Sequence, residues 1–262
     1  MNIVVVIPSR YGSTRFPGKP LAQIRGRSLL QRVWSIAQSV GNVSGIYVAT
    51  DDARIADHAA QFGANVVMTP AECRNGTERV LAAVRTLKAR PDAVVNLQGD
   101  AALTPPWVLQ ALVDTLRADP GVQMVTPAVQ CTAAQVREME ESKRTNPDSG
   151  TLVAFDRKGD ALYFSKSLIP HLRARDQDPP PVFHHIGIYG YRLETLERYC
   201  ALPEGPLERA EQLEQLRALE NGIPIRIVMV DYRDRSHWSV DSPQDVAKVE
   251  DIIAREGELI AV

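Results

Sequence analysis

The chain has 262 residues, of which 44% are apolar and 24% charged, a balance that excludes a disordered or fibrous protein. Thirty Lys and Arg against 32 Asp and Glu give a formal net charge of -2, so we expect neither a nucleic-acid nor a membrane partner, and any anion site must be local. Three widely spaced cysteines in no Cys-x-x-Cys pattern, and no apolar run long enough to span a membrane, lead us to expect a cytoplasmic protein.

The first half of the chain predicts strands that alternate with helices. Residues 3–7 are apolar and end at Pro8, which indicates a strand buried on both faces, and helical spacing starts at Leu29. Further strands are expected at 45–50, 64–68, 93–97 and 123–129, with helices near 53–62, 77–89 and 106–117. This alternation is typical of an α/β fold with a doubly wound, mostly parallel sheet.

The chain after about residue 146 has a different pattern. Short strands, prolines and turns predict a smaller β-rich lobe over about 146–205, within a single domain that covers 1–262. The expected elements here are strands at 151–155, 161–164 and 182–191, an exposed loop at 171–181, a helix near 207–219, a strand at 225–230 and a closing helix at 242–254.

A loop rich in cations follows the first strand, over residues 8–20. Its positive side chains are Arg10, Arg15 and Lys19. With two glycines and several hydroxyls beside them, they combine the fixed charge, bare backbone N–H groups and guanidinium donors that a polyphosphate requires. Five residues separate Gly12 from Gly18, which excludes a Walker A loop. Ligands of such sheets bind at the carboxyl ends of strands, so we expect a polyphosphate here; a solvated basic loop is the alternative.

Two carboxylates come at the ends of later segments. Asp100 follows the strand at 93–97, with Gly99 beside it leaving the backbone bare, and it is our first candidate ligand for Mg²⁺. Its alternative is a solvated loop carboxylate. Asp241 lies at the start of the last helix, just before Ser242 and a proline. It is either a second magnesium ligand or part of an ordinary helix N-cap.

Three further segments allow a functional and a structural interpretation. The segment 76–79 opens a helix whose free N–H groups suit an anionic or carbonyl-bearing partner, or it is a plain helix start. His184 and His185 are neighbours in a strand and point to opposite faces, so they cannot share one metal, and each alone is typically structural. Glu214 and Gln215 either face a ligand or form a solvated helix face.

Together these segments resemble the cytidylyltransferases that activate 3-deoxy-manno-octulosonate (Kdo), also called CMP-Kdo synthetases. The resemblance runs nearly end to end and is carried by the motifs at 7–20, 49–51, 76–79, 96–100, 161–165, 185–189, 206–208, 213–217 and 240–243. It implies a Rossmann-like fold, CTP and an acidic small molecule as substrates, Mg²⁺ as cofactor, a homodimer, and an acceptor and dimerisation role for the β-rich lobe.

The resemblance also implies a role for individual residues. Catalysis falls to Arg10, Arg15 and Lys19. Nucleotide binding falls to Pro8, Arg10, Gly12, Ser13, Thr14, Lys19, Thr50, Arg74, Gly76, Thr77, Arg79 and Asp100. Acceptor binding falls to Arg15, Gln98, Lys166, His185, Tyr189, Glu214 and Gln215. The magnesium ligands are Asp100 and Asp241.

The chain departs from the family pattern mainly on the acceptor side. Ala101 and Ala102 stand where the family usually has Glu-Pro, Lys166 and His184 each replace a usual Arg, and the segment 148–153 lacks an expected lysine. Three hypotheses follow: CMP transfer to Kdo, the same chemistry on another ulosonic acid or a small phosphonate, or a non-catalytic nucleotide-binding protein.

Overall fold

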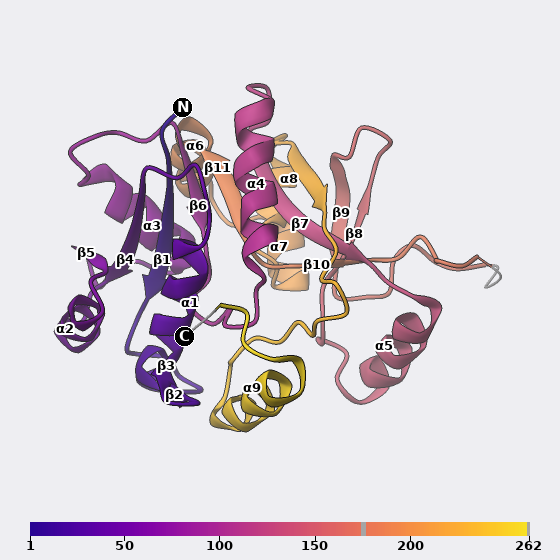
Figure 1. The fold of residues 1–262 in the computed structure, drawn as a ribbon. Coiled ribbons are helices and arrows are strands. Elements are labelled where there is room, and N and C mark those ends of the chain that lie inside the picture. Colours follow the sequence, from indigo (N-terminus) through magenta and orange to yellow (C-terminus); the bar gives the residue numbers. More distant parts are fainter. Residues whose placement is uncertain (174–176, 261–262) are drawn as a thin grey trace. The chain divides into compact units, whose positions relative to one another are not determined.

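The computed structural model describes residues 1–173 and 177–260, so residues 174–176 of the loop expected at 171–181 lie outside the described residues (Figure 1). The chain forms two compact units: unit 1 is Met1–Asp114 with Tyr232–Val262, and unit 2 is Thr115–Asp231. Among the described residues, no helix is both long and apolar enough to cross a membrane.

Unit 1 is built on parallel strands in the order β5, β4, β1 and β6. Its strands are β1 (Ile3–Ser9), β4 (Gly45–Thr50), β5 (Asn65–Met68), β6 (Ala93–Asn96) and the small hairpin of β2 (Gln23–Ile24) and β3 (Arg27–Ser28). Its helices are η1 (Lys19–Leu21), α1 (Leu29–Gln38), α2 (Ala53–Gln61), α3 (Gly76–Arg85), α9 (Pro243–Glu256) and the start of α4 (Pro106–Ala118). Every residue of β1 is buried, so both faces of this central strand are covered, as its apolar run predicts.

The strand register brings the ends of three strands together. Ser9, the last residue of β1, lies opposite Thr50, the last residue of β4. On the other side of β1, Val6 lies opposite Asn96, the last residue of β6. The loops that follow β1 and β6 therefore leave the sheet at the same edge, where ligands of such sheets bind.

Unit 2 is centred on β7 (Met124–Gln130), which pairs with antiparallel strands and with one parallel strand. The other strands are β8 (Leu152–Phe155), β9 (Ala161–Ser165), β10 (Phe183–His185), β11 (Tyr189–Arg192) and β12 (Ile225–Met229). The helices are α5 (Ala133–Thr145), α6 (Leu193–Ala201), α7 (Pro206–Glu211) and α8 (Leu216–Glu220). The segment 146–205 lies wholly within this unit.

The α/β fold predicted from the sequence is confirmed, with parallel pairing in unit 1 and mostly antiparallel pairing in unit 2. Helix α6, η1 and the hairpin of β2 and β3 were not predicted. Three further elements, all in unit 2, differ from expectation. The strand expected at 182–191 is two strands, β10 and β11. The helix expected at 207–219 breaks at Gln212, whose φ of 54° is left-handed. Helix α5 was not predicted, although Thr132 and Gln135 form a capping box at its start.

The close packing of Gly190 in β11 gives a test of the unit 2 core. A β-carbon at this position would lie 2.7 Å from Cγ2 of Val125 and 2.9 Å from Cδ1 of Leu116. We expect Gly190→Ala to lower the free energy of unfolding by about 1–3 kcal/mol, since both neighbours must move. Gly187→Ala is the control, because nothing lies within 4 Å of a β-carbon there. Equal urea midpoints for the two variants would contradict this packing.

Candidate active site

The loop between β1 and η1 has a fixed shape. The carbonyl oxygen of Tyr11 accepts hydrogen bonds from the N–H groups of Ser13 and Gly18, each 2.9 Å long. Gly18 has a φ of 71°, and the Tyr11 ring would lie 3.3 Å from any β-carbon there, so the position favours glycine. The guanidinium of Arg54 lies 3.3 Å from the centroid of the Tyr11 ring and pairs with Asp52. Backbone hydrogen bonds and α2 together hold the loop.

Four charged side chains from three distant segments meet beside this loop, and we call them the ion cluster: Arg15, Lys19, Asp100 and Asp241. Nζ of Lys19 lies 3.0 Å from Oδ2 of Asp100 and 3.7 Å from Oδ1 of Asp241. Nη2 of Arg15 donates to the same oxygen of Asp241 at 2.9 Å. Because the Lys19 side chain is only 17% exposed, its attraction to the carboxylates is screened less than that of a surface ion pair.

The two carboxylates of the ion cluster fit a magnesium ion. In proteins, Mg²⁺ is held by one or two carboxylates and takes its remaining ligands from phosphate oxygens and water. Asp100 and Asp241 both approach one ammonium group, so their oxygens converge on a single place for a cation. Both side chains are partly open to solvent, which leaves room for the other ligands.

The carboxylate of Asp241 is not needed to cap α9. The N-cap residue is Ser242, and Asp245 is its partner in a capping box. One carboxylate oxygen of Asp245 accepts from the N–H groups of Asp241 and Ser242 at 3.0 and 2.7 Å, and the other accepts from Nε1 of Trp238 at 2.8 Å. Burial raises the pKa of Asp245, but these hydrogen bonds outweigh burial and hold the pKa below its usual value. The interpretation of Asp241 itself as the cap is therefore wrong.

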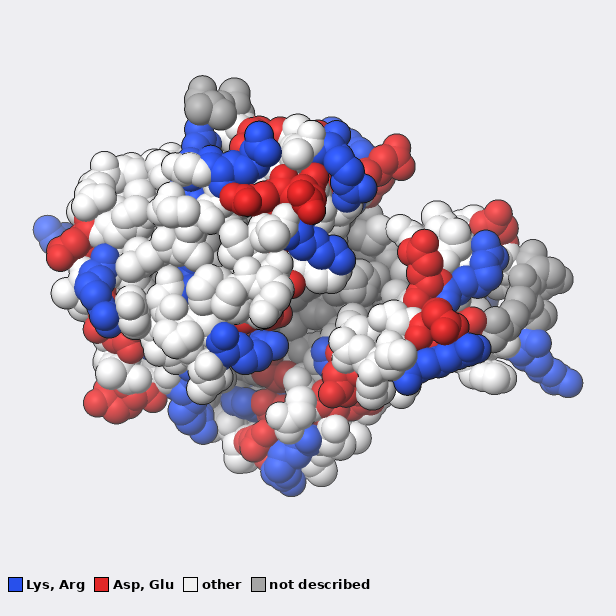
Figure 2. All heavy atoms as spheres, turned by 90° about the horizontal axis from the view of Figure 1, so that it is seen from below, with Lys and Arg blue, Asp and Glu red and all other residues white. Residues whose placement is uncertain are grey.

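A cleft of about 300 Å³ opens in unit 1 at the carboxyl ends of the strands. Its lining joins the cationic loop to the start of α3 and to the segment after β6. Glycine keeps the backbone bare at two places: a β-carbon at Gly76 would lie 3.2 Å from Pro8, and one at Gly99 would lie 2.8 Å from the carbonyl oxygen of Pro8. Elsewhere charges of both signs are interspersed over the face shown in Figure 2, which agrees with a local anion site.

Unit 2 gathers several of the residues expected to bind the acceptor. The hydroxyl of Tyr189 donates to Oε1 of Gln215 at 3.0 Å, and the rings of His185 and Tyr189 lie 5.6 Å apart. Nε2 of His185 shares a 2.9 Å hydrogen bond with Oγ1 of Thr126. Gln215 is only 2% exposed, so it does not belong to a solvated helix face, and its Nε2 has no hydrogen-bond partner among the described residues. Burial raises the pKa of Tyr189, which stays a hydrogen-bond donor.

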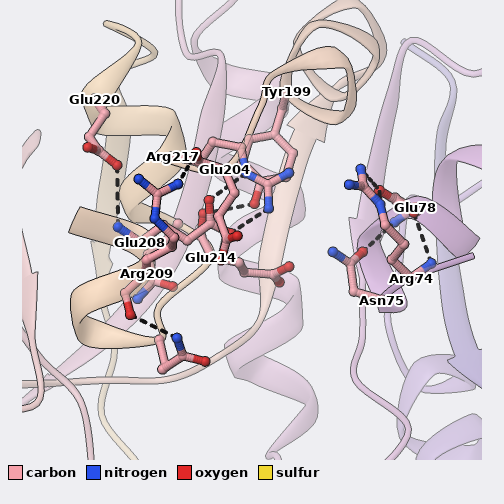
Figure 3. A network of polar contacts seen from close by, with 12 residues as sticks. Arg74, Asn75, Glu78, Tyr199, Glu204, Glu208, Arg209, Glu214, Arg217 and Glu220 are labelled. Atoms are coloured by element: carbon pink, nitrogen blue, oxygen red, sulfur yellow. Dashed lines mark hydrogen bonds and ion pairs between the residues drawn. The ribbon is translucent and has the colours of Figure 1, made fainter. Parts of the chain in front are cut away.

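A network of ion pairs fixes the segment that carries Glu214 and Gln215. In Figure 3 the guanidinium of Arg217 points at the carboxylate of Glu208, and both side chains are 7% exposed. The carboxylate of Glu220 accepts from the backbone N–H of Leu207 at 3.1 Å, which ties α8 to the start of α7. These bonds set the angle between the two short helices and so place the residues between them.

Comparison with known proteins matches the whole chain. The family described as Cytidylyltransferase matches residues 4–227. A 3-deoxy-manno-octulosonate cytidylyltransferase of Maricaulis maris is 54% identical over 99% of this chain and 100% of its own length. One of Chlamydia trachomatis is 43% identical over 94% of this chain and 92% of its own. The chain belongs to the 3-deoxy-manno-octulosonate cytidylyltransferase family.

Solved structures agree with this assignment. A CMP:2-keto-3-deoxy-manno-octonic acid synthetase in complex with CTP has a TM-score of 0.87 and 36% identity, covering 98% of this chain and 100% of the other. A 4-diphosphocytidyl-2C-methyl-D-erythritol synthase of Anaerococcus prevotii is 12% identical with a TM-score of 0.62 and shows the fold alone. As a member of the cytidylyltransferase family, the chain is a nucleotidyltransferase, which excludes the hypothesis of a non-catalytic nucleotide-binding protein.

In this cytidylyltransferase the cleft gathers most of the residues predicted for the nucleotide. Those that line it are Pro8, Arg10, Ser13, Thr14, Lys19, Arg74, Gly76, Arg79 and Asp100. The lining also includes Arg15 and Gln98, which were predicted for the acceptor, and Asp241, which was predicted for the metal, but it does not include Gly12. Thr50 and Thr77 are instead fully buried and lie outside the lining. Arg79 is 3% exposed, and its guanidinium donates to Thr69 at 2.7 Å and to Asp51 at 3.1 Å, so its charge is already neutralised.

Sequence reasoning missed several residues of the cytidylyltransferase site. The cleft is also lined by Ser9, Pro20, Cys73 and Asn75, and by Gly99, which the sequence had indicated only as a neighbour of Asp100. Each of them is adjacent in sequence to a residue that the motifs had singled out. Adjacency to a motif residue is therefore the signal that could have identified them. None carries a charge, which is why a search for cations and carboxylates passed over them.

In unit 2, Lys143 at the end of α5 lies beside the segment 148–153, where the resemblance led us to expect a lysine. Its Nζ donates to the carbonyl oxygens of Ser149 and Lys166. Burial, and then the charge of Lys166, lowers the pKa of Lys143. Beside it, Glu211 accepts from the N–H of Lys166 at 2.8 Å and from Oγ of Ser165 at 2.7 Å. A lysine therefore reaches the end of β9 from helix α5, and not from the segment 148–153.

The roles of Asp241 and Asp245 predict opposite effects of the same substitution. Asp241→Asn should leave the melting temperature unchanged, because the cap is made by others, yet lower turnover on the order of 100-fold through loss of a charged oxygen ligand. Asp245→Asn should lower the free energy of unfolding by about 0.5–2 kcal/mol through loss of the cap. Thermal melts and pyrophosphate release measure both. A fully active Asp241→Asn protein would contradict a metal role.

Proposed function

We propose that the protein transfers CMP from CTP to Kdo and releases pyrophosphate. The observation that carries the proposal is the ion cluster, in which Lys19 joins Asp100 and Asp241 at the edge of a cleft lined by further cations. A bound triphosphate requires several positive charges close together. A Mg²⁺ ion that binds together with the triphosphate requires carboxylate ligands. The names of the relatives at 54% and 43% identity support Kdo as the acceptor.

CMP transfer requires the protein to position the reacting groups and to neutralise the charge of the phosphates. A hydroxyl of the acceptor attacks the α-phosphorus of CTP, loses its proton, and the bond from that phosphorus to the leaving pyrophosphate breaks. Arg10, Arg15 and Lys19 hold the phosphate oxygens and stabilise the charge that grows on the pyrophosphate. Because the loop that carries them is fixed by Tyr11 and Gly18, this charge is in place before the nucleotide arrives.

We propose Mg²⁺ as the cofactor, held by Asp100 and Asp241. When bound, Mg²⁺ supplies positive charge that polarises the phosphoryl oxygens. Asp245 contributes by holding the backbone of Asp241 and Ser242 in the capping box, which leaves the Asp241 carboxylate directed at Lys19. Lys19 contributes by neutralising two carboxylates that would otherwise repel each other.

The acceptor is placed by residues of unit 2. Lys143 and Lys166 bring two positive charges to the end of β9, which suits an acid. Nε2 of Gln215, which has no hydrogen-bond partner among the described residues, is available for hydroxyl groups of a sugar, while Oε1 of the same side chain accepts from Tyr189. Ala101 and Ala102 are 7% and 4% exposed and do not line the cleft, so they do not widen it for a different acid. These observations favour Kdo over a small phosphonate.

A panel of acceptors tests the proposal. The purified protein, CTP and Mg²⁺ are mixed in turn with Kdo, its amino analogue, sialic acid and small phosphonates, and pyrophosphate is measured. We expect Kdo to be turned over best, and ATP in place of CTP to give no product. Turnover of a phosphonate with none of Kdo would overturn the choice of acceptor, and equal use of ATP and CTP would overturn the choice of nucleotide.

Lys143 gives a second test, on the acceptor side. Lys143→Met removes a charge that unit 2 holds beside Lys166, so kcat/KM for Kdo should fall about tenfold while the Kd of CTP stays the same. Lys158→Met is the matched control, since Lys158 lies in the exposed turn between β8 and β9. A loss of CTP binding, or equal activity of the two variants, would contradict a role confined to the acceptor.

The homodimer implied by the resemblance and the cytoplasmic location expected from the cysteines and the lack of a long apolar run stay predictions. Large apolar side chains are exposed on unit 2, namely Leu162, Leu207 and Met229. They support a homodimer that uses this unit, and we propose that the same lobe, at about 146–205, also serves the acceptor. Sedimentation equilibrium of the purified protein measures the number of copies.

A further inference from the structure

The strongest unexplained group in the cleft is the hydroxyl of Ser9. Ser9 is the last residue of β1 and is 3% exposed. Its Oγ is buried and has no hydrogen-bond partner among the described residues, yet the residue lines the cleft. A buried hydroxyl without a partner is unfavourable, and at the wall of a ligand cleft the missing partner is most simply an atom of the ligand.

The neighbours of Ser9 place it along the cleft. A β-carbon at Gly99 would lie 3.4 Å from Oγ of Ser9, so the hydroxyl lies against the bare backbone of Gly99. On one side of Gly99 comes Gln98, whose Oε1 lies by Gly76 at the start of α3. On the other side comes Asp100, which pairs with Lys19. Ser9 therefore lies between the α3 end of the cleft and the ion cluster.

We propose that Oγ of Ser9 donates a hydrogen bond to bound CTP, at an oxygen between the base and the β-phosphate. The inference rests on the proposed function, which puts the phosphates at the ion cluster. The base then lies toward the other end of the cleft, at Gly76, which the resemblance assigns to nucleotide binding. The oxygens in that middle part belong to the ribose and the α-phosphate, and both accept hydrogen bonds. Since the α-phosphorus is the atom attacked, a donor here positions the reacting group.

Ser9→Ala tests the inference by calorimetry with CTP, CMP and cytidine. The Kd of CTP should rise about three- to tenfold, the usual range for one lost hydrogen bond. The melting temperature without nucleotide should stay the same or rise, because the variant removes an unpaired buried hydroxyl. Ser35→Ala is the control, since the Ser35 hydroxyl donates to the carbonyl of Gln31 within α1 and does not line the cleft.

The three ligands separate the two kinds of oxygen. Weaker binding of CTP and CMP but not of cytidine assigns the bond to the α-phosphate, and weaker binding of all three assigns it to the ribose. Unchanged affinity for all three in a folded variant would overturn the inference, as would a lower melting temperature without nucleotide. Failure of the unmodified protein to bind CTP would instead overturn the proposed function and is a separate result.

Discussion

The ammonium group of Lys19, held between Asp100 and Asp241, is the interaction on which the site depends. Two carboxylates brought to one place repel each other, and a partly buried cation between them offsets that repulsion. The same lysine belongs to the loop that carries Arg10 and Arg15. One ion cluster therefore joins the segment after β1, the segment after β6 and the start of α9, which are far apart in the sequence.

The fold supplies what the ion cluster needs. Parallel pairing of β1 with β4 and β6 brings the strand ends to one edge, so the loops that follow are neighbours without long connections. Gly99 lets the backbone after β6 pass close to the carbonyl oxygen of Pro8, where any side chain would collide at 2.8 Å. The capping box of Asp245 and Ser242 starts α9 and leaves the carboxylate of Asp241 free for Lys19. Each of these features is local, and each fixes the position of residues that a sequence motif supplies.

The sequence predicted the chemistry of the site better than its fine geometry. The cationic loop, Asp100 and Asp241 follow from residue type and from their place at strand and helix ends, and all of them meet in the cleft. Thr50 and Thr77 were assigned to the nucleotide by resemblance, yet both are buried in the core. Which way a side chain points at the end of a strand, as for Thr50, or in the first turn of a helix, as for Thr77, depends on the packing around it, and a motif does not contain that information.

The differences in unit 2 have similar causes. Lys143 reaches the end of β9 from α5, a helix that the pattern of apolar residues did not predict because only Val136 is buried in it. Its capping box, Thr132 with Gln135, was the readable signal. Gln212 breaks the helix expected at 207–219 by adopting a left-handed φ, which glutamine rarely does and which no local rule foresees. Tertiary contacts such as the pair of Arg217 and Glu208 stabilise that break.

The most direct measurement of the central claim is a crystal structure of the protein with CTP and Mg²⁺ bound and no acceptor. The account predicts that the triphosphate lies against Arg10 and Lys19 and that the metal contacts the carboxylates of Asp100 and Asp241. A triphosphate bound elsewhere, with Lys19 still joined to both carboxylates and no metal beside them, would contradict it.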